Sequence, residues 1–144
     1  MESVVELEIN VAQPRLAELF ADPRNNPLWM DDVQRIEPIS GQLGFPGSTY
    51  RLVPKSGPFT FVATVVTREL PSRLSLTLEA KSVSVSVHAT LERLSDTCTK
   101  LISHETFKFK GILNKVFGLF SGKAIRAAHN HHMEGFKRFA EACR

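Results

Sequence analysis

Residues 122–143, GKAIRAAHNHHMEGFKRFAEAC, decide the fold, because they predict one long amphipathic helix at the end of a chain of strands. Apolar side chains recur here every three or four residues, which places them along one face of a helix. That face consists of Ile125, Ala128, Met133, Phe136, Phe139, Ala140 and Cys143. At about 100° per residue, His129 and His132 fall within the apolar face, and His131 points away from it.

The residues before this helix alternate between apolar and polar side chains, as half-buried strands do. In residues 82–91, SVSVSVHATL, the valines share one face and the serines lie opposite. Further segments of this kind are residues 3–11, 33–39, 48–53, 59–70, 73–80 and 99–109. A two-residue period over so many segments predicts an antiparallel sheet with one face exposed to water.

A short helix, residues 14–22, and a second short helix or tight turn, residues 23–33, follow the first strand. The fold class is therefore α+β: a strand, two short helices, about six more strands and a long helix. One helix of about twenty residues cannot cover a sheet of seven long strands. The sheet must curl around the helix and leave a space between them, which is a candidate ligand cavity.

Four motifs follow one another along the chain, with Gly47 placed before a strand. They are ELEINVAQPRLAELFADPRNNPLW, TRELPSRLSLTL, ATLERLSDTCTKL and GFKRFAEA. Their order and spacing resemble the START-related, Bet v 1-like superfamily, whose bacterial members are often called SRPBCC or polyketide cyclase/dehydrase-like proteins. The resemblance covers residues 1–144 as one START-like domain. It implies a helix-grip fold, a curved sheet wrapped around the last helix, but no single activity, since the superfamily includes lipid carriers, hormone binders, aromatases, cyclases and co-chaperones.

Glu105 departs from the apolar pattern that the resemblance implies for the last strand, as does Ser103 on the same face. A carboxylate on an apolar face is costly to bury unless it is paired or hydrogen-bonded. One interpretation is a cavity acid or base with a raised pKa, or a polar anchor for a ligand. The other is a bulged or twisted strand on which Glu105 reaches solvent or pairs with a cation of the helix.

His129 and His132 have two interpretations as well. Directed into the cavity, they join Glu105 as candidate catalytic groups for general acid–base chemistry. Alternatively, they are helix histidines that are hydrogen-bonded at the edge of the core. Two histidines and one carboxylate are a minimal set for a metal, and no HExxH motif or cysteine pair supports one. We therefore expect no metal and no cofactor.

The candidate cavity residues face inward on the predicted strands and helices. They are Trp29, Tyr50, Phe61, Leu76, Val87, Ser103, Glu105, Phe107, His129, Met133 and Phe136. Tyr50 and Trp29 also fit a purely structural role in the core. The glycines of GQLGFPG, residues 41–47, serve turns rather than a phosphate site, because this loop contains a proline and opens a strand instead of a helix.

Charge is unevenly distributed in a chain whose net charge is +3. Residues 1–99 carry a net −3, and residues 100–144 carry a net +6 with four of the five histidines. This indicates a solvated last helix or a weak contact with an anionic membrane surface. Scattered basic residues without interleaved aromatic side chains argue against nucleic acid as a partner.

The segment GILNKVFGLFSGK, residues 111–123, is unusually apolar for a loop. It fits either a gate over the cavity that touches a membrane or the first turn of the last helix, for which Ser121 is a candidate cap. An acidic N-terminus and two cysteines predict a cytoplasmic protein without a signal peptide or disulfide framework. We expect a monomer or a homodimer.

The leading functional hypothesis is a carrier or sensor that binds a lipid-like or aromatic hydrophobic small molecule in the cavity. The second is a polyketide cyclase or dehydratase (aromatase-like) that uses Glu105 and a helix histidine in the same cavity. The third is a membrane-docked or chaperone-type interaction module.

Overall fold

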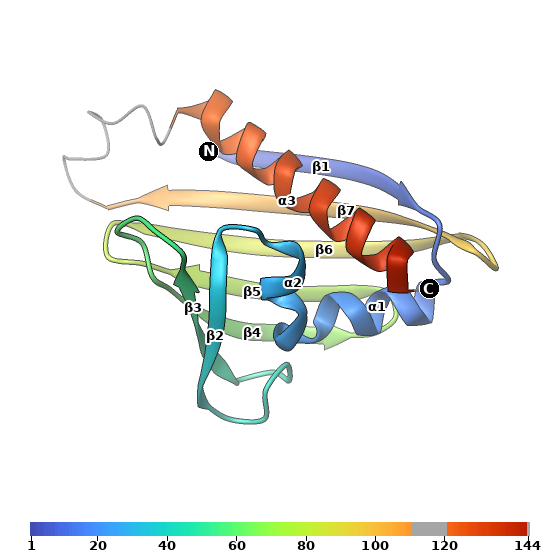
Figure 1. Ribbon diagram of the computed structural model, residues 1–144, viewed down its shortest axis with the longest axis horizontal. Helices are drawn as coiled ribbons and strands as arrows, with labels where there is room; N and C mark the ends of the chain where they lie inside the picture. The colour runs from blue at the N-terminus through green and yellow to red at the C-terminus, as the bar shows by residue number, and fades with distance from the viewer. Residues whose placement is uncertain (111–120, 144) are drawn as a thin grey trace.

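The computed structural model describes residues 1–110 and 121–143. Figure 1 shows a long helix lying across one side of a sheet. The elements in chain order are β1 (Glu2–Ile9), α1 (Gln13–Ala21), the 3₁₀ helix η1 (Pro23–Asn25), α2 (Asn26–Trp29), β2 (Val33–Ser40), β3 (Thr49–Pro54), β4 (Phe61–Glu69), β5 (Arg73–Glu79), β6 (Val83–Ser95), β7 (Cys98–Phe109) and α3 (Gly122–Cys143).

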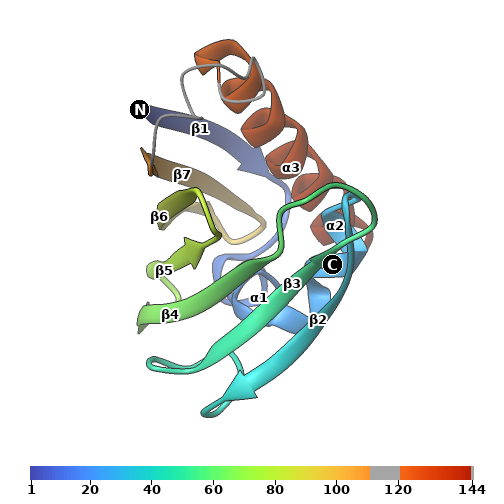
Figure 2. The same cartoon turned by 90° about the vertical axis from the view of Figure 1, so that its left-hand side faces the viewer.

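The strands form one seven-stranded sheet in the order β1-β7-β6-β5-β4-β3-β2, and every neighbouring pair is antiparallel. Figure 2 shows the sheet bending so that its hollow face turns toward α3. The first strand pairs with the last one, and β1 and β2 are the two edge strands of the sheet. The short helical elements α1, η1 and α2 connect these two edges along the chain. The predicted α+β helix-grip architecture is confirmed.

The predicted strands differ from the observed ones mainly at β6, which continues to Ser95 instead of ending at Leu91. The additional residues pair with the start of β7, as Glu92 does with Lys100 and Arg93 with Thr99. The end of β6 was not predicted because its residues are mostly polar and show no apolar alternation. The strand continues nevertheless, since backbone pairing does not depend on side-chain polarity.

Helix α3 begins where Ser121 caps it, as predicted. The Ser121 hydroxyl oxygen accepts a hydrogen bond of 3.1 Å from the backbone N–H of Ala124. The buried side chains of the helix are Ile125, His129, Met133, Phe136 and Ala140. The prediction that Ala128 belongs to this face is wrong, since Ala128 is exposed. The buried face is centred near His129, which places Ala128 about 100° around the helix from its middle.

Gly135 allows α3 to approach α2 closely. A Cβ atom at this position would lie 2.6 Å from the backbone carbonyl oxygen of Trp29, closer than such atoms pack. The absence of a side chain therefore sets the distance between the two helices. Beneath the contact, the rings of Trp29 and Phe136 meet edge to face with centroids 5.3 Å apart, and Phe20 packs on the same ring of Phe136 at 4.9 Å.

No helix among residues 1–110 and 121–143 is long and apolar enough to cross a membrane. Residues 111–120, which make up most of the predicted gate, lie outside the part of the chain that the structure describes.

Candidate ligand cavity

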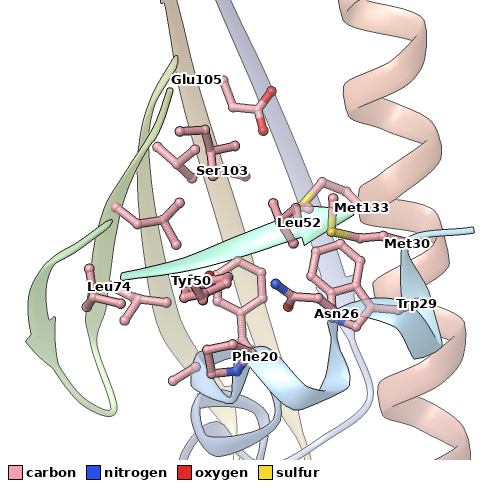
Figure 3. Close-up of a pocket in the computed structure, with 16 residues that line it drawn as sticks. Phe20, Asn26, Trp29, Met30, Tyr50, Leu52, Leu74, Ser103, Glu105 and Met133 are labelled. Atoms are coloured by element: carbon pink, nitrogen blue, oxygen red, sulfur yellow. The ribbon is translucent and has the colours of Figure 1, made fainter. Parts of the chain in front are cut away.

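A cavity lies between the hollow face of the sheet, helix α1, the η1–α2 segment and α3 (Figure 3). Most of its lining is apolar. The lining residues are Phe20, Ala21, Pro23, Asn26, Trp29, Met30, Tyr50, Leu52, Val65, Leu74, Leu76, Leu78, Val87, Ser103, Glu105 and Met133. About 70 Å³ of this space is open to the centres of water-sized molecules. The site is therefore narrow, with few polar groups and a single carboxyl group among its lining side chains.

Glu105 points into the cavity from a regular stretch of β7. It pairs with Ser3 of β1 on one side and with Val87 of β6 on the other, without a shift in register. Its side chain is only 17% exposed. Burial raises the pKa of Glu105 to about 7, and the nearby His132 opposes that rise. The alternative of a bulged strand that carries Glu105 to solvent is therefore contradicted.

His129 is fully buried behind this carboxyl group. Its Nδ1 atom lies 2.8 Å from the Ser3 hydroxyl and its Nε2 atom 2.9 Å from the Ser103 hydroxyl. Burial lowers the pKa of His129 to about 4, with contributions from the charges of His132 and His104. The imidazole is therefore neutral near pH 7, with one ring nitrogen donating to a serine oxygen and the other accepting from a serine hydroxyl.

The distance from His129 Nε2 to the nearer Glu105 oxygen is 3.7 Å. Such a distance fits an ion pair, but the two pKa shifts point the other way, since burial favours the neutral form of both groups. We take the contact to be a neutral histidine beside a carboxyl group that titrates near neutrality. Both ring nitrogens of His129 are thus bonded to serine hydroxyls, and one of these, the Ser103 hydroxyl, belongs to a residue that lines the cavity.

His131 and His132 bind the turn that follows α2. His131 Nε2 lies 2.7 Å from an Asp31 oxygen, and His132 Nε2 lies 2.9 Å from an Asp32 oxygen. The hydrogen bond with Asp32 is the main cause that raises the pKa of His132, against an opposing effect of burial. The same bond lowers the pKa of Asp32. These pairs tie α3 to the turn next to the cavity residues Trp29 and Met30.

Tyr50 and Asn26 form a second polar point on the cavity wall, lower in Figure 3 than Glu105. Burial raises the pKa of Tyr50 to about 12, and a hydrogen bond with the Asn26 side chain opposes that rise. Each residue therefore satisfies the other. Trp29 differs, because its buried indole Nε1 has no hydrogen-bond partner among the residues that the structure describes.

The predicted cavity residues fall into two groups. The structure places Trp29, Tyr50, Leu76, Val87, Ser103, Glu105 and Met133 at the cavity. It does not place Phe61, Phe107, His129 and Phe136 there. Phe136 is fully buried in the main core, and Phe61 and Phe107 pack with Val83, Val85 and Val87 at the far end of the sheet. A shared face of the sheet is thus insufficient, because the cavity occupies only one part of that face.

Several lining residues were not singled out from the sequence. On the strands they are Leu52, Val65, Leu74 and Leu78, and in the helical segments they are Phe20, Ala21, Pro23, Asn26 and Met30. Alternation marks the strand residues as inward-facing. Asn26 carries no such signal, since its role depends on how the short helices turn. Asp31 and Asp32 were not predicted as histidine partners either.

The metal-ligating side chains of the described residues are dispersed. No three histidine, cysteine, aspartate or glutamate residues within residues 1–110 and 121–143 are placed to hold a metal ion together. At the cavity, Glu105 offers a carboxyl group that can exchange a proton, and the remaining wall offers apolar contact. This arrangement suits binding of an apolar molecule through one polar group.

Comparison of the sequence with protein-family models and with curated proteins gives no match. Comparison of the fold with solved structures does give matches. A START superfamily protein from Mycobacterium smegmatis superposes with a TM-score of 0.75 at 12% identity, over 98% of this chain and 94% of that one. The Zhui aromatase/cyclase from a Streptomyces species gives 0.78 at 12% identity, over 98% and 93% of the two chains.

Norcoclaurine synthase from Thalictrum flavum, solved in complex with dopamine and hydroxybenzaldehyde, gives a TM-score of 0.69 at 12% identity, over 100% of this chain and 89% of that one. At sequence identities this low, the similarity establishes the fold and does not establish the activity. The resemblance found in the sequence is thus confirmed at the level of structure: this chain has the helix-grip fold of START and Bet v 1-like proteins.

Proposed function

We propose that this protein binds a compact hydrophobic small molecule in the cavity beneath α3, as a carrier or a sensor. The observation that carries the proposal is a mostly apolar cavity whose wall includes one largely buried carboxyl group, Glu105. Apolar walls give affinity at about 25 cal/mol per Å² of buried surface, and one polar group fixes the orientation of the ligand.

The size of the cavity favours a compact ligand over a long lipid. An apolar cavity of about 150 Å³ holds a benzene ring. Here the open space is about 70 Å³, so a ring enters only when side chains move. Met30 and Met133 line the cavity and are the side chains best suited to such movement, because methionine is unbranched and flexible. The two small aromatic molecules bound to norcoclaurine synthase belong to the same size class.

Native mass spectrometry of the purified protein, with organic extraction of whatever co-purifies, is the first test. An NMR titration with benzyl alcohol then tests the cavity directly. Leu76→Phe fills the cavity from the middle of β5 and should weaken binding, whereas Val66→Phe, on the exposed face of the sheet, should leave it unchanged. No co-purified molecule together with no shift at the lining residues would contradict the proposal.

A second candidate is an acid–base reaction in the same cavity, favoured by the pKa of Glu105 near 7. A cyclase or dehydratase needs a second group, and the geometry supplies little. His129 does not line the cavity and is held by the hydroxyls of Ser3 and Ser103, and the pKa of Tyr50 is raised to about 12. If the protein turned over a poly-β-ketone substrate and Glu105→Gln abolished this turnover, the enzyme hypothesis would be favoured over the carrier or sensor hypothesis.

A further inference from the structure

We propose that the cavity selects hydrophobic amines, whose ammonium group pairs with the Glu105 carboxylate while the apolar part lies against the aromatic and leucine side chains of the wall. This proposal rests on the proposed function and specifies its ligand class. Figure 3 shows the arrangement: Glu105 lies at one end of the cavity, and Phe20, Leu52 and Leu74 lie farther along it.

The first argument is that Glu105 lacks a hydrogen-bond donor in the described part of the chain. His129 Nε2 lies 3.7 Å from a carboxyl oxygen of Glu105, beyond hydrogen-bond distance, and that nitrogen is already bonded to the Ser103 hydroxyl. A buried carboxylate normally accepts several hydrogen bonds or pairs with a cation. A ligand that brings donors would therefore satisfy a group that the surrounding described residues leave open.

The second argument is that the charged groups around Glu105 do not neutralise it. From α3, His129 is neutral, and His132 is bonded to Asp32. From β1 and β6, the paired residues are the uncharged Ser3 and Val87. The N-terminal ammonium bonds to the Phe107 carbonyl oxygen instead. Among the described residues, His132 offsets only part of the cost of ionising Glu105, because the pKa of Glu105 stays raised. A ligand that carries a positive charge would supply the rest.

The third argument is energetic. Removing the two ions from water is the main cost of a buried ion pair, and here folding has already removed most of the water around the Glu105 carboxyl group. An ammonium group adds charge-assisted hydrogen bonds, which are about twice as strong as neutral ones. An alcohol of the same shape can donate one hydrogen bond to the carboxylate but carries no opposite charge, and a carboxylic acid brings a like charge. We therefore expect an affinity for the amine about tenfold above that for the matching alcohol.

The experiment compares benzylamine with benzyl alcohol by NMR titration of the full-length protein. Wild type should bind the amine about tenfold more tightly near pH 7. The affinity for the amine should rise at least about tenfold from pH 5 to pH 7 as Glu105 ionises, while that for the alcohol should change far less. Glu105→Gln should remove both the preference and the pH dependence. Glu134→Gln, an exposed glutamate on α3, is the matched control.

Each outcome is decisive for one of the two proposals. If both probes bind equally and Glu105→Gln changes neither, amine selection is wrong and hydrophobic binding stands. If the pH dependence persists in Glu105→Gln, it originates from His132 and amine pairing with Glu105 is wrong. If neither probe binds wild type, both proposals fail. The fold of each variant is checked in the same spectra, so loss of structure is separated from loss of binding.

Discussion

His129 and His132 lie three residues apart on α3, yet the structure gives them opposite protonation behaviour. His129 sits between two serine hydroxyls with no exposed side-chain surface, and its pKa falls to about 4. His132 has 22% of its side chain exposed, bonds to Asp32, and its pKa rises. Hydroxyl groups satisfy either form of an imidazole, whereas a carboxylate favours the cation.

The difference teaches that the partner, more than depth alone, determines what a helix histidine does here. His129 completes the core next to the cavity as a neutral group. His132 links α3 to the turn that follows α2 through Asp32, which raises its pKa. Separate changes to the two sites should therefore have different sizes and different pH dependence.

The largest effect is expected for His129→Ala. The variant removes two hydrogen bonds, leaves the buried hydroxyls of Ser3 and Ser103 without their partner, and opens a cavity. We expect a loss of about 4 kcal/mol in the free energy of unfolding, measured by urea denaturation at pH 7. The control is His131→Ala on the exposed face of the same helix, which should change little. Equal losses in the two variants would refute the distinction.

The second effect concerns Glu105 and its pH profile. The native pKa lies near 7 against an ordinary value of 4.5, so the folded protein retains a proton that the unfolded chain releases between these values. Stability from this group is thus lost as the pH rises from 4.5 to 7. Relative to wild type, Glu105→Gln should gain up to about 3 kcal/mol across that window.

The contribution of His129 to stability changes with pH in the opposite direction. Its native pKa of about 4, against 6.5 in the unfolded chain, means that stability is lost as the pH falls from 6.5 to 4. In wild type the contributions of Glu105 and His129 to the free energy of unfolding change in opposite directions between about pH 4.5 and 6.5. A variant that lacks one of the two groups should therefore show the pH dependence of the other. Urea denaturation at steps of pH measures both. A Glu105→Gln profile parallel to that of wild type would show that Glu105 titrates normally.

The smallest effect is expected for His132→Ala, which breaks the bond to Asp32. Because the native pKa of His132 is raised, its contribution is full below about pH 6.5 and is lost as the pH rises through the native value. We expect a cost of about 1 kcal/mol near pH 6 that shrinks at higher pH. The pKa of Asp32, followed by NMR, should return upward in the variant. An unchanged Asp32 pKa would argue against the pair in solution.

Much of the fold follows from periodicity in the sequence. Alternation placed Ser103 and Glu105 on the inward face of the last strand, and the helical period placed His129 on the buried side of α3. Both periodicities can be read from short stretches of sequence. Because the sheet and the helix pack against each other on one face, the apolar side chains of each must turn to that face.

The partners of these residues were not predictable from such signals. The same alternation places Ser3 inward, but nothing local indicates that it meets a histidine 126 residues away. Asp31 and Asp32 lie in a turn, where no period fixes the direction of side chains. The aromatic residues Phe61 and Phe107 pack against Val83, Val85 and Val87 and do not line the cavity, although Val87 itself does.

The hydrogen bond between Ser3 and His129 has a consequence for the order in which the protein is assembled. It joins the first strand to the last helix, and β1 must also wait for β7 before it can pair. During synthesis from the N-terminus, the first strand has no partner until β7 has left the ribosome. The wall that carries Glu105 therefore closes last, and a ligand meets a finished cavity only on a completed chain.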